Sequence, residues 1–453
     1  MCGIIGVYNH EKAAELATLG LFAEQHRGQE SCGMAVSDGK VIRLEKSLGL
    51  VKEVFTAEKL KYLTGNLAVG HVRYPTCGSS SKFNSQPHVV ETLAGPSFCL
   101  ASNGDIVNYN EVRRKLEAKG VYFASGNDGE LILKFIVYYV EKENMSMIDA
   151  IHKMTATLKG AFSTVLATRT EMYLFRDPLA IRPMVYGETE DGTFVVASES
   201  CALDILGIEK KYEMEAAEII VVNEKGRRSI KHDPNDFRQV TSDKHCIFEH
   251  IYFSRPDSFE FGEAVYDVRE KIGAKLADND KIVADAVLPV PDSANFIALG
   301  YAKRKNIIFE MALIRNHYVG RTFIKPEQTI RDESVKQKFN TLPGFFEGKS
   351  VVMIDDSIVR GTTLRKIVKL VRKAGAREIH LRIGSPEVKN SCFYGIDTPT
   401  SQELIANQKS VEEICEYLGA DSLKYLNIDD LKDCVKEPGS YCDACFTGNY
   451  PID

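Results

Sequence analysis

Residues 350–376 read SVVMIDDSIVRGTTLRKIVKLVRKAGA, and this stretch decides the class of the second half of the chain. An apolar run ends in two adjacent carboxylates, Asp355 and Asp356, and a short loop containing Gly361 follows. After the loop, apolar residues recur at the spacing of one helix face. The stretch therefore predicts a buried strand, a phosphate-binding turn and an amphipathic helix whose first N–H groups face an anion.

The side chains of this turn fit a phosphorylated ligand better than an ordinary capped turn. Ser357, Thr362 and Thr363 supply hydroxyl groups. Two carboxylates at the end of a buried strand are costly without a ligand or a cation, and threonine capping would leave them unexplained. The turn is not a Walker loop, because no Gly-Lys-Ser/Thr follows its glycine. The carboxylates are placed to hold hydroxyl groups or a Mg²⁺-bound ligand.

The order of predicted strands and helices differs between the two halves of the chain. ADAVLPV, NIIFEMALI and EIHLRIG are apolar runs separated by helical segments, which predicts a parallel, doubly wound sheet. Before residue 230 short strands come in pairs with helices between them, which is typical of antiparallel sheet covered by helices. The polar stretch 225–243 is interpreted as a linker. We expect domains at 2–230 and 245–400 and a helical, charged tail at 401–453.

Composition excludes several classes of protein. The 453 residues are too many for one ordinary core. Lys and Arg number 57 against 63 Asp and Glu, a net charge of -6 that argues against nucleic acid as the main partner. No apolar run of about 18 residues and no secretion signal is present, so we expect a cytoplasmic protein without a membrane span. The odd count of 11 cysteines argues against a disulfide scaffold.

The chain opens MCGIIGVYNH, with Cys2 directly behind the initiator methionine. The thiol is either a nucleophile or a small residue on a buried first strand, and these ten residues alone do not decide. Removal of Met1 would give Cys2 a free α-amine with an unperturbed pKa of roughly 8, which suits a base for its thiol. We expect maturation by removal of this methionine alone.

The turn at 350–376 resembles the phosphoribosyl pyrophosphate (PRPP) signature of type I phosphoribosyltransferases. The resemblance implies that the acidic pair contacts the ribose hydroxyls and that the loop wraps the 5-phosphate. It also implies that Ser293, at the end of VLPVPDS, joins the pair around Mg²⁺. The PRPP-binding residues that it implies are Asp355, Asp356, Ser357, Arg360, Gly361, Thr362 and Thr363. The polar stretch 315–339 is either a solvated loop or, by resemblance, a lid with Arg321 and Lys325 near the pyrophosphate.

The phrases CGIIG, QHRGQES, GHVRYPTCG, SNGDIVN and NDGELIL resemble the glutaminase domain of N-terminal-nucleophile amidotransferases. The resemblance implies that the Cys2 thiolate attacks the glutamine amide, giving a glutamyl thioester and ammonia. It implies oxyanion donors in the Asn103 side chain and the Gly104 N–H. Arg73 would bind the α-carboxylate of glutamine and Asp128 its α-ammonium.

Each of these residues also has an ordinary structural interpretation. Arg73 would form a surface ion pair, Asp128 would cap the following helix, and Asn103-Gly104 would be a tight turn. Their joint occurrence, in the right order from Cys2, favours function. One departure is Ser102, which stands where many relatives have histidine before the Asn-Gly pair.

Together the two halves resemble the glutamine PRPP amidotransferase family. This implies an α+β, four-layer αββα Ntn-hydrolase (class II glutaminase) domain followed by an α/β type I phosphoribosyltransferase domain with a helical extension. The implied reaction converts glutamine, PRPP and water to 5-phosphoribosylamine, glutamate and pyrophosphate, the entry to purine synthesis, with ammonia passing through a closed internal route. The resemblance also implies inhibition by AMP, GMP, ADP and GDP, and a homotetramer.

Two other functions share part of this sequence pattern. An aminosugar synthase shares the Cys2 domain but has sugar-isomerase domains in place of the PRPP signature. A catalytically silent PRPP- or nucleotide-binding regulator would have no need of the intact glutaminase residues.

Cys442 and Cys445 form a Cys-x-x-Cys pair that by itself is ambiguous among zinc, redox and cluster sites. With Cys246 and Cys392 the pattern resembles the iron–sulfur, Bacillus-type subclass. That implies a [4Fe–4S] cluster, with a structural and oxygen-sensing role. The other thiols are expected to be buried apolar residues: Cys32, Cys77, Cys99, Cys201, Cys415 and Cys434.

Overall fold

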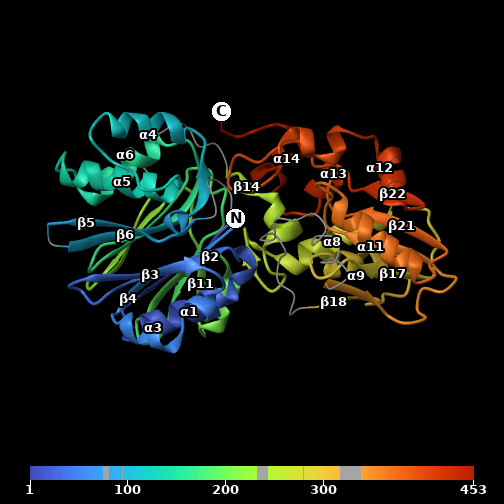
Figure 1. Ribbon diagram of the computed structural model, residues 1–453, viewed down its shortest axis with the longest axis horizontal. Coiled ribbons are helices and arrows are strands. Elements are labelled where there is room, and N and C mark those ends of the chain that lie inside the picture. Colours follow the sequence, from blue (N-terminus) through green and yellow to red (C-terminus); the bar gives the residue numbers. More distant parts are fainter. Residues whose placement is uncertain (75–80, 94, 232–242, 279, 317–337, 453) are drawn as a thin grey trace.

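Figure 1 shows the computed structural model as two lobes, the first half of the chain in blue to green and the second in yellow to red. The described residues are 1–74, 81–93, 95–231, 243–278, 280–316 and 338–452. The first lobe is a stack of two antiparallel sheets between helices, and the second is a parallel sheet between helices. Among the described residues no helix has the length and hydropathy needed to cross a bilayer.

Seven antiparallel strands form the sheet that carries the N-terminus. In sheet order they are β11 (Lys211–Glu213), β9 (Val185–Glu188), β10 (Phe194–Ala197), β1 (Gly3–Tyr8), β4 (Leu67–Arg73), β2 (Ser31–Ser37) and β3 (Ile42–Leu48). The outer face of this sheet is covered by α1 (Ala13–Ala23), α2 (Val51–Val54), α3 (Ala57–Tyr62) and α7 (Ser200–Ile205). Strand β1 lies between β10 and β4, so its neighbours fix it on both sides.

The second sheet has six antiparallel strands. They are β13 (Gly226–Ile230), β12 (Ile219–Asn223), β8 (Met172–Arg176), β7 (Gly160–Ala167), β6 (Gly95–Ile106) and β5 (His88–Thr92). Helices α4 (Tyr109–Glu117), α5 (Asp128–Glu141) and α6 (Met147–Thr157) cover its outer face. Ile4 and Val69 of the first sheet pack on Val165 and Leu174 of the second, so the expected αββα order is confirmed.

The second lobe is built on four parallel strands, as its strand–helix alternation predicts. They are β17 (Ala286–Pro289), β20 (Ser350–Asp355), β21 (Glu378–Ile383) and β22 (Ser422–Tyr425). Along β20, Val352 and Ile354 face the layer of α8 (Val265–Asp278) and α9 (Asn295–Lys305). Val351 and Met353 face the layer of α11 (Thr362–Lys373) and α12 (Val411–Leu418). Helices thus cover both faces.

Two expectations about this lobe were wrong in detail. NIIFEMALI is not a full sheet strand: Phe309 makes one isolated bridge to Val287, and β18 (Leu313–Arg315) pairs with β19 (Phe339–Thr341). The run lies at the sheet edge and leaves Ile308 and Met311 exposed. The tail is not purely helical either, because β22 extends the parallel sheet beside β21.

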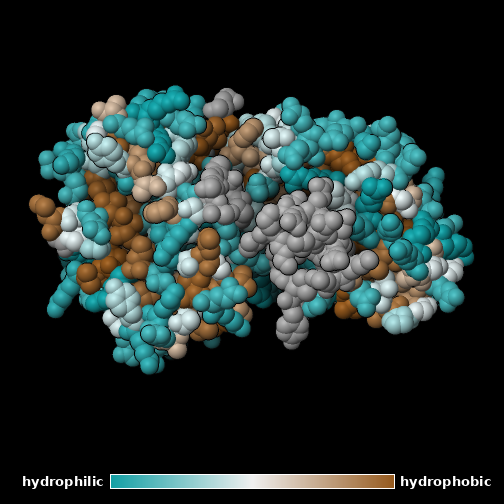
Figure 2. Space-filling model, viewed as in Figure 1, coloured by the Kyte–Doolittle hydropathy of each residue, from teal (hydrophilic) through white to brown (hydrophobic). Residues whose placement is uncertain are grey.

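Short elements connect the two lobes and the tail. Strand β14 (His245–Cys246) pairs in parallel with β23 (Tyr441–Cys442), and β15 (Phe259–Glu260) pairs with β16 (Glu263–Ala264). The other elements of the tail are α13 (Ile428–Lys432) and α14 (Ala444–Thr447). Figure 2 shows mostly hydrophilic residues over the visible face, with apolar residues gathered at the open side of the first lobe's sandwich.

Candidate active sites

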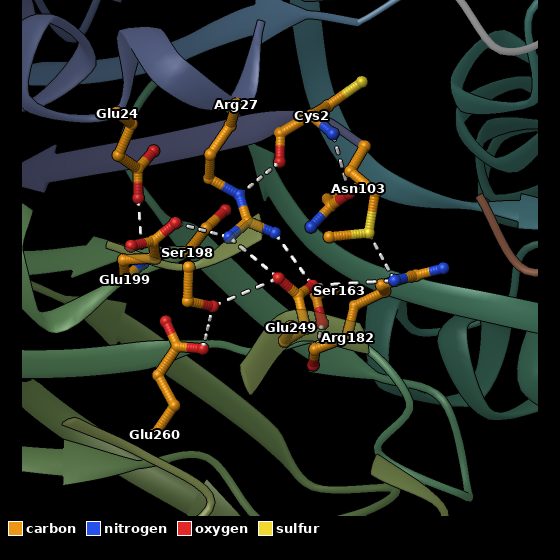
Figure 3. A network of polar contacts seen from close by, with 12 residues as sticks. Cys2, Glu24, Arg27, Asn103, Ser163, Arg182, Ser198, Glu199, Glu249 and Glu260 are labelled. Carbon is orange, nitrogen blue, oxygen red and sulfur yellow. Dashed lines mark hydrogen bonds and ion pairs between the residues drawn. The ribbon is translucent and has the colours of Figure 1, made fainter. Parts of the chain in front are cut away.

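Cys2 directly precedes β1, the strand held on both sides in the first sheet. Its backbone N–H donates to Oδ1 of Asn103 at 3.0 Å, and its thiol lies 3.8 Å from the carbonyl oxygen of Tyr74. Asn103 comes from β6 of the other sheet, so the two sheets meet at Cys2 (Figure 3). The alternative of a merely buried small residue explains the packing of Cys2 but not this contact with a polar side chain.

Asn103 and Gly104 have the properties of an oxyanion site. The Asn103 Nδ2 group is buried and makes no hydrogen bond within the described part of the chain, so a donor is free beside Cys2. Gly104 has φ +155, and a Cβ there would lie 1.8 Å from the carbonyl oxygen of Ala161. Only glycine fits this position. The pair lies within a continuous strand, which excludes the tight-turn interpretation.

Arg73 is a buried residue and not part of a surface ion pair. Its Nη1 group contacts Glu30 Oε2 at 2.6 Å, and both side chains are nearly inaccessible to solvent. Asp128 begins α5, but Asn127 caps that helix by accepting the Gly129 N–H at 2.9 Å. Asp128 Oδ1 accepts the same N–H at 3.0 Å, so Asp128 also takes part in capping the helix, and its role as a partner for an α-ammonium group stays a prediction.

The electrostatics of Asp128 fit a cationic ligand. Burial and the neighbouring Asp105 raise the pKa of Asp128 to about 8, while Arg73 acts in the opposite direction. Arg73 and Asp128 therefore lie within electrostatic range of each other, as a pair that binds both charges of an amino acid requires.

Arg27 is a site residue that the sequence did not reveal. It is fully buried, and its Nε donates to the carbonyl oxygen of Cys2 at 2.9 Å. The next residue, Gly28, lies so near Arg73 that a Cβ would come within 2.5 Å of the Arg73 backbone. The motif QHRGQES contains both residues, but an arginine after a helix gives no local sign of a partner elsewhere in the chain.

The Ser102 side chain makes its own hydrogen bond and does not contact the candidate oxyanion donors, the Asn103 side chain and the Gly104 N–H. Its hydroxyl group is 2.8 Å from the hydroxyl of Thr164, and its backbone is bracketed by the side-chain amide of Gln86. The departure from histidine therefore leaves a satisfied hydroxyl pair next to Asn103.

The acidic pair lies at the carboxyl end of β20. Ser293 Oγ donates to Asp356 Oδ1 at 2.5 Å, and Ser357 Oγ donates to Asp356 Oδ2 at 2.6 Å. Burial raises the pKa of Asp355 and Asp356, and the negative charge of Asp356 adds to the effect on Asp355. Serine and carboxylate oxygens are ligands that Mg²⁺ prefers, and a cation would relieve this repulsion, so the residues fit the ion.

The loop after the pair has the geometry of a phosphate-binding turn. Gly361 has φ +70 and precedes α11, and exposed Thr362 and Thr363 form its first turn. Arg360 is exposed and contacts Glu403 at 3.1 Å. Arg321 and Lys325 lie outside the described residues.

The four candidate cluster cysteines converge at the junction of the lobes. Cys246 and Cys442 are register partners in the β14–β23 pair. Burial raises the pKa of the Cys445 thiol well above its usual range, and the Cys246, Cys392 and Cys442 thiols raise it further. Within the described residues no group of three or more His, Cys, Asp or Glu side chains is placed to hold one metal ion. The electrostatic effect of the Cys246, Cys392 and Cys442 thiols on Cys445 is the observation that favours a shared ligand, and the [4Fe–4S] cluster stays a prediction.

The remaining thiols follow the expectation of packing residues where they are described. Cys32, Cys99, Cys201 and Cys434 are buried, Cys415 is partly buried, and Cys77 lies outside the described residues. Burial raises the pKa of Cys32 and Cys99 to about 12, which leaves them poor nucleophiles.

Comparison with known proteins identifies both domains. Residues 76–204 match the model of the glutamine amidotransferase domain, and residues 258–383 match that of the phosphoribosyl transferase domain. The fold and the two sites thus define a glutamine amidotransferase joined to a phosphoribosyltransferase.

Relatives that match along the whole chain identify the family within this class. The chain is 46% identical to amidophosphoribosyltransferase 1, chloroplastic, of Arabidopsis thaliana, over 100% of this chain and 78% of the relative. It is 41% identical to the amidophosphoribosyltransferase of Bacillus subtilis, over 100% and 94%. The solved glutamine PRPP amidotransferase from B. subtilis, complexed with ADP and GMP, superimposes with a TM-score of 0.91 at 40% identity, covering 100% of this chain and 98% of that one. The chain belongs to the amidophosphoribosyltransferase family, whose reaction is the first step of purine biosynthesis.

Proposed function

We propose that Cys2 releases ammonia from glutamine and that this ammonia reaches PRPP bound at Asp355 and Asp356, giving 5-phosphoribosylamine and pyrophosphate. The observation that carries the proposal is the arrangement at Cys2. Its N–H meets Asn103 Oδ1, while the Asn103 Nδ2 donor is left free for an oxyanion.

The glutaminase half-reaction uses residues of the first lobe. After removal of Met1 the α-amine of Cys2 takes the thiol proton, and the thiolate attacks the amide carbon of glutamine. Asn103 Nδ2 and the Gly104 N–H stabilise the tetrahedral oxyanion, which collapses to a thioester as ammonia leaves with the proton. Water then hydrolyses the thioester to glutamate and free Cys2. Arg73 and Asp128 hold the substrate's α-carboxylate and α-ammonium.

The transferase half-reaction depends on positioning. Asp355 and Asp356 would bind the ribose hydroxyls, and Ser293 would join them in holding Mg²⁺. Mg²⁺, when bound, would draw charge from the departing pyrophosphate. The 5-phosphate would be held by Ser357, Arg360, Gly361, Thr362 and Thr363, with Arg321 and Lys325 near the pyrophosphate. Ammonia attacks C1 as the bond to pyrophosphate breaks, and exclusion of water protects the reactive centre.

A [4Fe–4S] cluster on Cys246, Cys392, Cys442 and Cys445 is proposed as a structural and oxygen-sensing element. The convergence of the four thiols supports it. Since the overall reaction transfers no electrons, the cluster supplies no catalytic step.

Regulation and assembly are proposed from the relatives. The B. subtilis structure holds ADP and GMP, and a second similar structure, at a TM-score of 0.92, is described as an allosteric regulatory enzyme of purine biosynthesis. We therefore propose that AMP, GMP, ADP and GDP inhibit this enzyme, which acts as a homotetramer in the cytoplasm. The named plant relatives are chloroplastic.

The proposal is tested by Cys2→Ala, assayed for pyrophosphate release with glutamine or with ammonium chloride, each with PRPP. Glutamine-dependent release should fall about a thousandfold or more, while ammonia-dependent release is retained. Cys99→Ala, which removes a buried thiol from β6, is the matched control and should keep both activities. Loss of both activities in Cys2→Ala would contradict the division of labour. A wild-type protein that binds PRPP but releases no pyrophosphate would favour the silent regulator.

A further inference from the structure

A buried charge network behind Cys2 joins the two halves of the chain. Arg27 of the first lobe meets Glu249 through two contacts, Nη2 to Oε1 at 2.9 Å and Nη1 to Oε2 at 3.2 Å. Glu249 begins a π-helical turn, η3 (Glu249–Phe253), which follows the linker. Both side chains have no solvent exposure. Figure 3 shows Glu249 between Arg27 and Arg182.

The other carboxylate that contacts Arg27 is that of Glu199, which also contacts several other groups. Glu199 Oε1 contacts Arg27 at 2.5 Å and His26 at 2.6 Å. Glu199 Oε2 accepts hydrogen bonds from the Arg255 N–H and the Ser258 hydroxyl, each at 2.8 Å. Glu249, in contrast, meets the guanidinium with both oxygens, which is the geometry that fixes its plane.

Two further carboxyl groups nearby do not compete for Arg27. Burial raises the pKa of Glu24 and of Glu260 well above the usual range, and the hydrogen bonds of Arg27 go to Glu199, Glu249 and the Cys2 carbonyl oxygen. The Ser254 hydroxyl donates to Glu260 at 2.6 Å and lies 3.1 Å from Glu249 Oε2. The guanidinium is therefore oriented by Glu199 and Glu249.

The orientation of Arg27 decides how Cys2 is held. Asn103 holds Cys2 at its nitrogen, and Arg27 holds it at its carbonyl oxygen. Once Met1 is removed, Cys2 has a covalent neighbour on one side only. The carbonyl contact then limits rotation of the residue that carries both nucleophile and base, and a misplacement of about 1 Å can cost about a hundredfold in rate.

We propose that Glu249, contributed by the second half of the chain, is a positioning residue for the glutaminase reaction and acts on Cys2 through Arg27. This inference rests on the proposed role of Cys2 as nucleophile. Glu249 lies between the two ranges matched to family models, 76–204 and 258–383, and belongs to neither. Arg182 supports Glu249 from the other side at 3.5 Å, and its Nε donates to the Tyr394 carbonyl oxygen at 2.7 Å.

The test is Glu249→Gln in the full-length chain, which preserves shape and removes charge. The kcat for glutamine hydrolysis should fall about tenfold to a hundredfold. The KM for glutamine should stay within about threefold, because the variant leaves Arg73 and Asp128 in place. Alkylation of Cys2 by 6-diazo-5-oxonorleucine, a reactive glutamine analogue, should slow in parallel, while ammonia-dependent synthesis is retained. Glu263→Gln is the matched control: Glu263 is equally buried, contacts Lys271 and the Lys436 N–H, and should leave the glutaminase kcat unchanged.

A glutaminase kcat within about twofold of wild type in Glu249→Gln would overturn the inference. Equal loss of glutamine- and ammonia-dependent activity, with a lower unfolding temperature, would overturn it in favour of a purely structural role. Cys2→Ala is measured in the same assays. If that variant keeps glutaminase activity, the proposed function itself fails. If Glu249→Gln does not fold, Glu249→Asp replaces it, keeping the charge with a shorter reach. An unchanged kcat in that variant overturns the inference, and a selective loss supports it.

Discussion

The carboxyl group of Asp128 shows how a single residue can be prepared for its ligand. With a pKa of about 8, it keeps its proton across the neutral range, while the same group in the unfolded chain ionises near pH 4. Between these values the folded state binds more protons than the unfolded state, so the free energy of unfolding falls as the pH rises through this window. The α-ammonium of glutamine can take the place of the proton and relieve that cost.

Glutamine binding should therefore release a proton from the enzyme below about pH 8. Calorimetric titration at pH 7 in two buffers of different ionisation enthalpy measures this proton. Asp128→Asn should abolish the release and raise the KM for glutamine about tenfold to a hundredfold, since it loses a charge-assisted contact. A wild-type binding enthalpy that is the same in both buffers would refute the assignment.

At the scale of an element, β20 combines a packing strand with a repulsive end. Its alternating side chains join two cores, Val351 and Met353 on one face and Val352 and Ile354 on the other. This register carries the chain directly into two adjacent carboxyl groups whose pKa values burial raises. The packing of the strand thus stabilises a segment whose two terminal carboxyl groups are unfavourable without a ligand.

Asp355→Asn combined with Asp356→Asn should stabilise the unliganded protein and abolish PRPP binding. Removing the buried negative charge should raise the midpoint of thermal unfolding at pH 7 by about 2 °C or more. Because the pKa values of both carboxyl groups are raised in the folded protein, their charges lower the free energy of unfolding only above the unfolded-state pKa of about 4. Below about pH 4 both groups are protonated in both states, so the gain in unfolding temperature should vanish. Differential scanning calorimetry and PRPP titration with Mg²⁺ measure the two effects. Unchanged PRPP affinity would contradict the site assignment.

The same elements show what sequence can and cannot predict. The strand–turn–helix at 350–376 was predicted because periodicity, glycine and paired carboxylates are local signals. The strand β22 was missed because its residues lie at the sheet edge, half exposed, and carry no alternation. Arg27 and Glu249 were missed because their pairing spans 222 positions, and nothing within either segment encodes the other.

At the scale of the whole molecule, the tail is tied to the end of the linker and to the first elements of the second lobe. Strand β23 pairs with β14, and the Lys436 N–H donates to Glu263 at 2.8 Å. Lys275 of α8 contacts Asp433 at 2.7 Å. The four candidate cluster thiols lie at this junction, so a ligand bound there would hold the tail, the end of the linker and the Cys392 segment together.

Protein purified without oxygen should contain about four iron atoms per chain. Cys442→Ser should lose this iron and expose the segment after residue 434 to limited proteolysis, because the junction is opened. Cys434→Ser removes a buried thiol from the same tail and should retain the iron. Elemental analysis and mass spectrometry of the fragments measure both results, and stoichiometric zinc in place of iron would disprove the cluster.

The pairing of Arg27 with Glu249 also bears on events during synthesis. The first lobe leaves the ribosome before the second and can begin to fold while translation continues. Throughout that interval Arg27 has no Glu249 to meet, because 222 positions separate them. From the proposed role of Glu249 we expect a nascent first lobe to hydrolyse glutamine about tenfold to a hundredfold more slowly until the segment that carries Glu249 has been made.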